Sequence, residues 1–571
     1  MAFDGIVTKA IASELQELAG ARMDKIFQPN KNTILLGFYL DGHHYLLNLC
    51  TDAQNYRIHL TTHPKSNPKV APNFCMVLRK HLLGLHIKSI TTNNLERLVI
   101  IDFEGFDEVD DIISKRLIVE LMGKHCNIIL LDEQNIIIDS LRHIHNEDST
   151  RVIFPHIKYA YPTTTKYNFL DCSSFQDFYE KISSSSKNAI YDIFNGISKS
   201  FIEASMSHLG IETFQQNNLE KLYHYLQGIV HRTDSNLLDF AILTAKKRDY
   251  FLIEAETESS PFHLNFFLDD FYHEKETSEE FKTYRDSILK MILDLFKKYK
   301  KRLLNIDEKL NACKDMEKYQ IYGELITANL YQIPNQNVKE ITLDNYYDNQ
   351  KITIPLDDKY SPSVNAKRFF KKYHKLKNAL EIVTSQKEDT MKELTYIESI
   401  VYELENSSTL EEISEIFEEI SENVIFKEKT EHLKNKKKAK VKKSSLTKNK
   451  KVSFNPFKYT IDGYTLLVGR NNKENDYLTL KYAKKTDLWF HTKDIHGSHA
   501  ILQLNPNHLP HDSILIQCAE IVAYHSKARN SSNVPVDICE TKYVKKPNGS
   551  KPGMVIYTNH KTLYVNPKKR I

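Results

Sequence analysis

Residues 281–310 read FKTYRDSILKMILDLFKKYKKRLLNIDEKL, a stretch in which apolar side chains recur every three or four positions. The apolar residues of this stretch are Phe281, Tyr284, Ile288, Ile292, Leu295, Tyr299, Ile306 and Leu310. A later stretch repeats the pattern with Phe369, Tyr373, Leu376, Leu380, Val383, Leu394, Ile397, Val401 and Leu404. Spacing of this kind lines one face of a helix with apolar groups, so the two stretches predict the arms of an antiparallel coiled coil.

The predicted coiled coil spans about residues 270–430 and carries a small module at its tip. Between the arms, at about residues 332–362, the sequence NYYDNQKITIPLDD is rich in turn-forming residues and interrupts the helical spacing. An apolar stripe usually marks the surface along which two helices pack. The pattern by itself therefore indicates a rigid lever and no further function of the arms.

The sequence before the coiled coil predicts a β-rich unit with some helix at residues 1–172. The run NTILLGFYLDGHHYLLNL holds two strands around Asp41-Gly42, a pair favoured in tight hairpin turns. The run PNFCMVLRKHLLGL begins with Pro72 and continues with helical spacing of its apolar residues. Three strand-like runs follow, RLVIIDF, RLIVELM and NIILLDEQNIIIDSL, before a linker-like segment, HIKYAYPTTTKY.

Residues 173–240 predict a helical unit. In YDIFNGISKSFIEASMSHLG, Asn195-Gly196 separates two helical runs, and Ser198 is a candidate N-cap of the second. Amide groups at such a turn are able to bind a phosphate backbone, although many helix pairs merely pack against each other. Both interpretations stay open on the local pattern.

Charge is divided unevenly along the chain. The net charge is only +4, but residues 431–571 hold 27 Lys and Arg against 10 Asp and Glu, which is +17 and leaves −13 for residues 1–430. The run KNKKKAKVKKSSLTKNKK contains ten lysines and no acid, so we expect a basic disordered linker at residues 431–452. A solvated tether is one interpretation of this run. Contact with RNA is favoured, because lysines that neutralise phosphates release counterions.

Composition excludes several classes of protein. No run of eighteen apolar residues is present, so no membrane-spanning helix is expected, and the N-terminal sequence lacks the apolar core of a secretory signal. The seven cysteines are scattered and form no CxxC pair, which argues against a structural zinc site and a disulfide framework. We therefore expect a cytoplasmic protein that contacts no membrane.

Residues 453–571 predict a compact α/β unit that contains the unusual stretch KTDLWFHTKDIHGSHAIL. Its histidines at positions 491, 496 and 499 do not match a zinc site on a helix, because Gly497 interrupts the helix and the required glutamate is missing. A nucleophilic role for Ser498 lacks the GxSxG turn. What remains is a surface of rings and donors for RNA, with a core role for Trp489 as the competing interpretation.

Cations surround this stretch in the sequence, with Lys481, Lys484 and Lys485 before it and Lys542 and Lys551 after it. The RNA-binding residues predicted for this unit are Arg470, Trp489, His491, Lys493, Ser498, His499, Lys545 and Lys546. No catalytic residue and no metal ligand is predicted.

Ordered blocks along the whole chain resemble the NFACT family, in particular its bacterial RqcH branch, which is related to NEMF and carries the older name fibronectin-binding protein. The blocks are FDG (3–5), FCMVLRKHL (74–82), ELMGKHCNIIL (120–130), YGELITANLY (322–331), SPSVNAKRFFKKYHKLK (361–377), VGRNNKENDYLTLKYAKKTDLWFHTKDIHGSHAIL (468–502), YHSKARNSSNVPVD (524–537) and VKKPNGSKPGMVIY (544–557). The resemblance implies a multidomain α+β fold. Its parts are a glycosylase-like β-rich NFACT-N domain (1–172), a helix-hairpin-helix domain (173–240), the long antiparallel coiled coil with its middle module, the basic linker and an α/β NFACT-R domain (453–571).

The resemblance also implies a ribosome quality-control factor. Such proteins bind large ribosomal subunits that still carry a peptidyl-tRNA with its stalled nascent chain. They recruit alanyl-tRNA and support the addition of C-terminal alanine tails without mRNA, which marks the chain for degradation. The implied partners are the rRNA and stalk base of the large subunit, both tRNAs and the small RNA-binding protein RqcP. Because the ribosome performs peptidyl transfer, no enzymatic activity and no cofactor are expected.

The family's Asp-Arg pair for tRNA recognition aligns with Glu96-Arg97, where glutamate replaces aspartate. The tRNA-binding residues that the resemblance implies are Glu96, Arg97, Glu120, Lys124 and His125. Two further departures are His496, where the family commonly has proline, and His156, where it commonly has glycine.

Two other functions remain as alternatives. A fibronectin-binding surface adhesin would require export, which the absent signal sequence does not favour. A glycosylase-like or nuclease-like enzyme would require the proline and glutamate that glycosylases of this fold carry at the N-terminus. The chain has Ala2 and Phe3 there.

Overall fold

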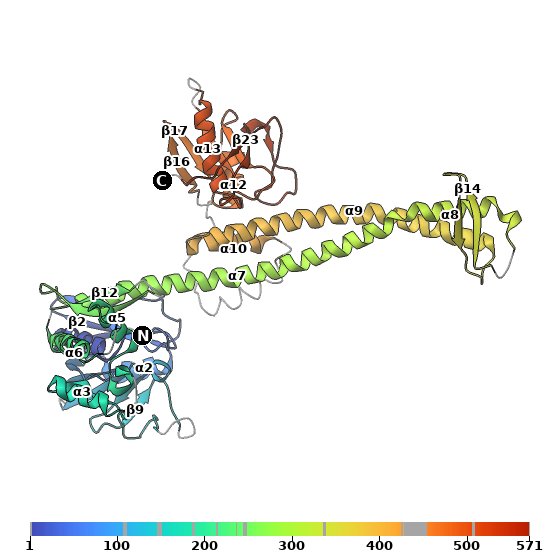
Figure 1. Ribbon diagram of the computed structural model, residues 1–571. Coiled ribbons are helices and arrows are strands. Elements are labelled where there is room, and N and C mark those ends of the chain that lie inside the picture. Colours follow the sequence, from blue (N-terminus) through green and yellow to red (C-terminus); the bar gives the residue numbers. More distant parts are fainter. Residues whose placement is uncertain are drawn as a thin grey trace. The chain divides into compact units, whose positions relative to one another are not determined.

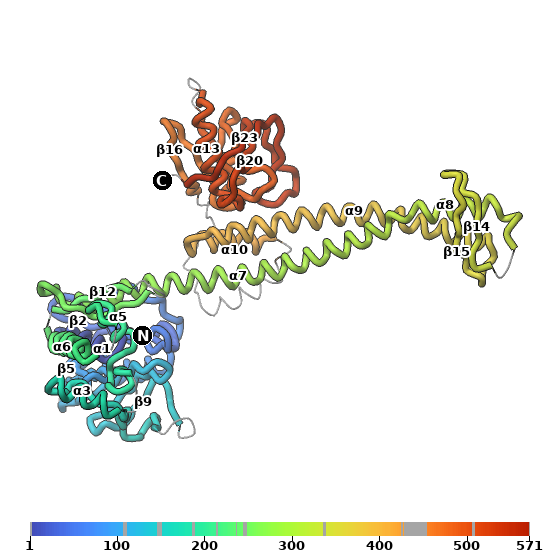
Figure 2. The backbone as a smooth tube through the Cα atoms, in the orientation of Figure 1, coloured from blue at the N-terminus to red at the C-terminus, as the bar shows by residue number. Residues whose placement is uncertain are grey.

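The computed structural model describes residues 3–106, 111–145, 151–185, 189–212, 215–235, 237–243, 248–334, 338–423, 426, 454–504 and 509–569. The chain divides into two compact units, Met1–Ser278 and Glu279–Ile571. Each unit contains both helices and β-sheet (Figures 1 and 2), so the predicted multidomain α+β class is confirmed. The basic linker expected at residues 431–452 lies outside the described residues.

The first unit is built on an antiparallel sheet of nine strands, in the order β4-β3-β2-β1-β5-β6-β7-β8-β9. The strands are β1 (Arg22–Asn30), β2 (Thr33–Leu40), β3 (His43–Cys50), β4 (Arg57–Leu60), β5 (His86–Thr92), β6 (Leu98–Phe106), β7 (Ile112–Glu120), β8 (Asn127–Leu131) and β9 (Ile137–Ser140). The predicted hairpin is confirmed, since Asp41 and Gly42 join β2 to β3 with φ of 50° and 84°, the left-handed values that a tight turn needs. The helix predicted at Pro72 is also confirmed as α2 (Asn73–Leu82), with Pro72 as its N-cap.

Helices pack on this sheet and share its core. They are α1 (Gly5–Leu15), α3 (Phe175–Ser183), α4 (Ile190–Ile193), α5 (Lys199–His208) and α6 (Gln216–His231), with a hairpin of β12 (Leu238–Leu243) and β13 (Asp249–Glu254). The predicted turn between helices is confirmed. Gly196 has φ of 76°, and the hydroxyl of Ser198 accepts a hydrogen bond from the Phe201 amide as the N-cap of α5.

Three chain segments meet at backbone contact beside this turn. The Gly5 amide donates to the Gly196 carbonyl at 2.7 Å. A Cβ added at Gly5 or Gly196 would lie 1.8 or 1.9 Å from the Leu95 carbonyl oxygen, so neither position has room for a side chain. The carboxylate of Asp4, which is buried, caps α1 at Ile6 and Val7 and also accepts from the amide and hydroxyl of Ser198. The loop before β6 is therefore fixed against the helix turn.

The second unit contains the coiled coil, which is antiparallel as predicted. Its helices are α7 (His263–Lys314), which begins in the first unit, α8 (Met316–Ala328) and α9 (Pro362–Asn406) (Figure 1). Ile292 and Ile397 share one core, Asp307 pairs with Lys387 at 2.8 Å, and the rings of Tyr319 and Phe369 stack, so the order along one arm reverses along the other. The segment between the arms forms the hairpin of β14 (Glu340–Asn345) and β15 (Gln350–Pro355).

A further helix, α10 (Leu410–Glu422), packs on the arms and was not distinguished from them in the sequence. It starts with a capping box in which Thr409 and Glu412 bond each other's backbone, and it buries Ile413, Ile416 and Ile420 against α7 and α9. A capping box followed by isoleucines three and four residues apart is the sequence signal that identifies this helix.

The C-terminal domain is a six-stranded sheet in the order β16-β17-β19-β18-β20-β23, with helix α13 on one face. Its elements are β16 (Phe457–Ile461), β17 (Tyr464–Val468), α12 (Asn472–Tyr477), β18 (Leu488–Thr492), β19 (Ala500–Gln503), α13 (Asp512–Tyr524), β20 (Val534–Glu540), β21 (Val544–Lys545), β22 (Ile556–Tyr557) and β23 (Lys561–Val565). Helix α13 buries Ile514, Cys518, Ile521 and Val522 against the sheet. Separate apolar clusters fill the two faces of the sheet.

The contact at Gly196 generates a stability prediction. Gly196→Ala adds a Cβ that meets the Leu95 carbonyl and holds alanine at a left-handed φ, so we expect a loss of about 3 kcal/mol or more. Gly210→Ala is the matched control, because Gly210 has φ of 64° but open space around it, and we expect a loss of only about 1 kcal/mol. Hydrogen exchange of the amides of α1 and β6 in the full chain measures both losses. Equal losses would contradict the backbone contact.

Candidate nucleic-acid interface

Arg97 is held at the end of the loop that leads into β6. Its carbonyl accepts a hydrogen bond from the Leu121 amide at 2.8 Å, and its guanidinium donates to the hydroxyl of Tyr56 at 3.2 Å. The side chain is half-buried, so the group is positioned by the protein and still partly open to solvent. A guanidinium held in this way retains further N–H donors for a phosphate or a base.

Glu96 does not share the partners of Arg97. The Asn93 side-chain amide donates to the Glu96 carboxylate at 3.2 Å. Partial burial raises the pKa of Glu96, and the nearby carboxylate of Glu120 raises it further. The longer side chain at this position is therefore accommodated by a local hydrogen bond within the loop.

Glu120 is a structural carboxylate. It is 1% exposed, it pairs with Arg151, and it accepts a hydrogen bond of 2.7 Å from the Tyr159 hydroxyl. Direct contact of Glu120 with tRNA does not fit this burial. Tyr159 belongs to the segment predicted as an exit linker, so that linker in fact begins by packing back on the sheet.

Lys124 and His125 lie on an exposed one-turn helix, Gly123–His125, that leaves the end of β7. Because Leu121 is bonded to Arg97, this turn leaves the sheet at the end where the Arg97 loop enters it. The structure therefore brings Glu96, Arg97 and Glu120 together, and it presents Lys124 and His125 to solvent on the adjoining turn.

Trp489 lies in the core of the C-terminal domain. It is 0% exposed on the central strand β18, and it packs among Leu467, Leu478 and Ile501. Its ring neighbours are His491, His499 and Tyr557. Phe490 is equally buried on the opposite face of the strand, so the expected stacking platform is wrong for Trp489 and the competing core interpretation holds.

The neighbouring histidines are neutral parts of the same structure. His499 is 2% exposed, its ring shares a hydrogen bond with the Thr479 hydroxyl, and burial lowers its pKa to about 3. Burial also lowers the pKa of His491 to about 4. Ser498 is buried, and its amide donates to the His525 carbonyl. None of these three residues offers a charged group to a phosphate.

Two of the predicted cations have carboxylate partners within the second unit. Arg470 lies 3.2 Å from Glu474 and 3.8 Å from Glu412, and Lys546 pairs with Asp476. Lys493 is half-buried, whereas Lys545 is exposed.

Exposed lysines gather at one edge of the C-terminal domain, which we call the lysine edge. Its members are Lys481, Lys484, Lys485, Lys542 and Lys545. The Lys542 amide donates to the Lys485 carbonyl at 3.3 Å, which joins the two loops, and Tyr482 beside them is 42% exposed. Exposed ammonium groups and an exposed ring are what contact with an RNA backbone requires.

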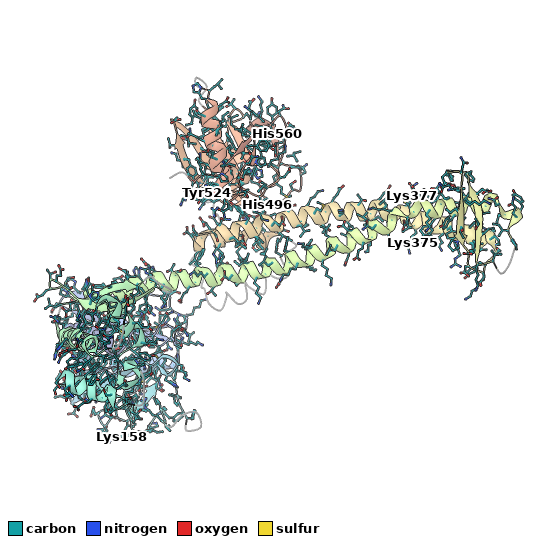
Figure 3. The ribbon with its side chains drawn as sticks, in the orientation of Figure 1. Lys158, Lys375, Lys377, His496, Tyr524 and His560 are labelled. Atoms are coloured by element: carbon teal, nitrogen blue, oxygen red, sulfur yellow. The ribbon has the colours of Figure 1, made fainter. Side chains whose placement is uncertain are left out.

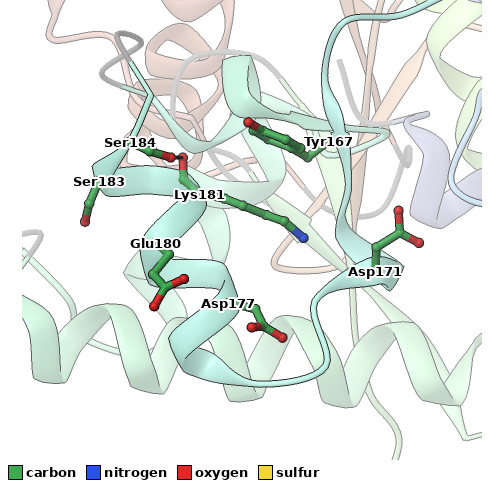
Figure 4. Close-up of a pocket in the computed structure, with 7 residues that line it drawn as sticks. All are labelled: Tyr167, Asp171, Asp177, Glu180, Lys181, Ser183 and Ser184. Atoms are coloured by element: carbon green, nitrogen blue, oxygen red, sulfur yellow. Dashed lines mark hydrogen bonds between the residues drawn. The ribbon is translucent and has the colours of Figure 1, made fainter.

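A hollow in the first unit does not suit a polyanion. It is lined by Tyr167, Asp171, Asp177, Glu180, Lys181, Ser183 and Ser184 (Figure 4). Three carboxylates surround one lysine there, and the ammonium group of that lysine lies 3.5 Å from the Cys172 thiol. In the described parts of the chain, no group of three or more His, Cys, Asp or Glu residues is placed to hold a metal ion, and no helix has the length and apolar character to cross a bilayer.

The burial of Trp489 predicts its fluorescence. Because this is the only tryptophan of the chain, its emission reports on one site. We expect iodide to leave the emission of the native protein unquenched and saturating RNA to leave it unchanged, since the ring is not accessible to stack on a base. Strong quenching of the native protein by either agent would contradict the core position.

The buried histidines predict an acid-sensitive domain. The unfolded chain takes up protons below about pH 6.5, whereas folded His499 resists protonation until about pH 3, so stability is retained above pH 6.5 and lost as the pH falls through that window. At pH 5 the loss from His499 amounts to about 2 kcal/mol. Denaturant unfolding followed by Trp489 emission measures it. In His499→Asn the pH slope should flatten, even if the variant is less stable at pH 7.

Family models and known relatives match this chain over nearly all of its length. Residues 4–440 match the family model of the NFACT N-terminal and middle domains, and residues 452–559 match that of the NFACT protein RNA binding domain. The Rqc2 homolog RqcH of Bacillus subtilis (strain 168) is 33% identical over 581 residues, which cover 99% of this chain and 98% of that protein. The Rqc2 homolog RqcH of Streptococcus suis (strain 05ZYH33) is 34% identical over 575 residues, with coverage of 99% and 98%.

Among solved structures, the fibrinogen binding protein from Staphylococcus aureus covers 48% of this chain and 99% of its own, with 29% identity and a TM-score of 0.40. The family models and the full-length relatives agree with each other. The chain therefore belongs to the NFACT family.

Proposed function

We propose that this protein is a ribosome quality-control factor that binds RNA and positions it. In this role it binds large ribosomal subunits carrying a peptidyl-tRNA and recruits alanyl-tRNA, so that the stalled chain receives a C-terminal alanine tail and is marked for degradation. The observation that carries the proposal is the end-to-end similarity to proteins named Rqc2 homolog RqcH, together with the match of residues 452–559 to an RNA-binding domain.

The proposed contacts follow the two groups of cations. Arg97, with Lys124 and His125 on the adjoining turn, would contact the tRNA, while the lysine edge would contact the RNA backbone of the ribosome or the tRNA. The coiled coil would reach the stalk base, and RqcP would assist. The ribosome would form the peptide bond, because the protein contributes proximity between reactants that it does not itself transform.

Recovery of RNA from cells tests this function. A tagged full-length protein is isolated at low salt, and its RNA is sequenced. We expect large-subunit rRNA and a tRNA that accepts alanine, with recovery falling steeply between 50 and 200 mM salt, because about six to ten neutralised phosphates correspond to about a thousandfold loss or more. Absence of both RNAs would refute the proposal.

The role of Arg97 is tested in the same experiment. We expect Arg97→Ala to lose most of the tRNA and to keep much of the large subunit, because the remaining cations still hold rRNA. Arg22→Ala is the matched control, since Arg22 is an exposed arginine at the start of β1 in the same unit and its loss changes the net charge equally. If the two variants retain tRNA equally, Arg97 has no particular role.

A further inference from the structure

Helix α10 carries a row of carboxylates on one face. Glu412, Glu415, Glu419 and Glu422 are spaced by three, four and three residues, so they point to the same side of the helix. The adjoining side of α10 is apolar, and its isoleucines are buried against the coiled coil. We call these four residues, with Glu393 and Glu398 of α9, the acidic ridge.

The glutamates of α10 meet four consecutive residues of the C-terminal domain, Arg470 to Lys473. The Glu412 carboxylate lies 3.8 Å from the Arg470 guanidinium, and Glu415 accepts a hydrogen bond of 3.0 Å from the side-chain amide of Asn471. Glu419 accepts a hydrogen bond of 3.4 Å from the side-chain amide of Asn472, and Glu422 accepts one of 2.8 Å from the ammonium group of Lys473. Each carboxylate therefore faces one cation or side-chain amide of this segment, in sequence order.

Helix α9 extends this contact on the same domain. Glu393 lies 3.3 Å from Lys551, and Glu398 lies 3.0 Å from the ring nitrogen of His496, which is labelled in Figure 3. The side-chain oxygen of Asn406 accepts a hydrogen bond of 3.0 Å from the Arg529 guanidinium. We call the residues of the C-terminal domain that make these contacts, Arg470 to Lys473, His496, Arg529 and Lys551, the docking face. This face is distinct from the lysine edge, whose members make none of these contacts.

The docking face presents the groups that a nucleic-acid backbone would require. Guanidinium, ammonium and side-chain amide donors in a row bind phosphate oxygens as readily as carboxylate oxygens. We propose that the acidic ridge is an internal competitor of RNA, which occupies the docking face until RNA phosphates replace its carboxylates. This inference rests on the proposed RNA-binding function and adds a second RNA surface whose access is regulated.

The contact is suited to reversal because its outer pairs are weak. Glu422 is 64% exposed and Glu398 is 38% exposed, and exposed ion pairs contribute only about 0.2–1 kcal/mol each. An RNA that brings several phosphates at once, and releases their counterions, is able to displace such a set.

The centre of the contact holds two buried carboxylates, Glu403 and Glu419. Burial raises the pKa of Glu419 to about 7, and burial followed by the proximity of Glu419 raises that of Glu403. The groups that face the pair are the Tyr396 hydroxyl from α9, the side-chain and backbone amides of Asn472, and the charges of Lys473 and Asp476 from the C-terminal domain. Burying two carboxyl groups side by side costs desolvation free energy, which limits the stability of the docked state.

Neutralising the ridge tests the competition in the full chain. The variant combines Glu398→Gln, Glu412→Gln, Glu415→Gln and Glu422→Gln, which keeps helix-forming side chains and a residue at position 412 that still completes the capping box. The matched control combines Glu381→Gln, Glu388→Gln, Glu411→Gln and Glu418→Gln, which are exposed positions on the same two helices and change the net charge equally. Fluorescence anisotropy measures binding of a labelled RNA hairpin, and hydrogen exchange at residues 470–473 measures docking.

We expect the ridge variant to bind the hairpin about tenfold more tightly than the control variant, with faster exchange at residues 470–473. Faster exchange with equal affinity would overturn the competition and leave the contact as a scaffold. Unchanged exchange would overturn the docking itself. If none of the proteins, including the unmodified chain, binds RNA at low salt, the proposed RNA-binding function fails and this inference fails with it.

Salt provides a second readout. Salt weakens docking as well as RNA binding, so in the unmodified chain the competitor is lost as the RNA contacts weaken. The affinity of the unmodified chain should therefore fall less steeply with salt than that of the ridge variant. Parallel slopes, with equal affinities, would overturn the competition.

Discussion

The buried carboxylate of Asp4 is the interaction on which the arrangement of the first unit depends. Burial raises its pKa, which means that the ionised form is costly there, and hydrogen bonds from α1 and from Ser198 offset this cost. One side chain thus caps the first helix and fixes the turn of a distant helix pair. Because Gly5 and Gly196 then meet the Leu95 carbonyl, the loop that ends at Arg97 takes its position from backbone contacts and not from flexible side chains.

The second unit is organised by a separation of charge along its elements. The first half of α9 is rich in exposed lysines, among them Lys375 and Lys377, which are labelled in Figure 3. Its second half and α10 carry the acidic ridge. The C-terminal domain carries its cations in two separate places, the docking face and the lysine edge. A net charge near zero therefore conceals surfaces of strong and opposite sign.

Local sequence patterns predicted the helices, strands and turns more reliably than they predicted which side chains are buried. The hairpin at Asp41-Gly42, the cap at Ser198 and the two arms follow from backbone preferences and apolar spacing, which act within a few residues. The burial of Trp489 did not follow, because a central strand with a core on each face shows no alternation and is flanked here by polar residues. His156 is similar: its φ of 68° explains why a glycine is common there, and only the structure shows it.

The two groups of accessible cations differ in what they are able to recognise. Arg97 is half-buried, and its guanidinium is already oriented by the Tyr56 hydroxyl, so its remaining donors point in defined directions. The lysine edge consists of exposed ammonium groups on flexible stems, which neutralise phosphates without demanding a particular geometry. Contacts of the first kind select among RNAs, whereas contacts of the second kind add affinity for any of them. Under the proposed function, selectivity for a tRNA would therefore reside at Arg97, and the lysine edge would add affinity for RNA of any sequence.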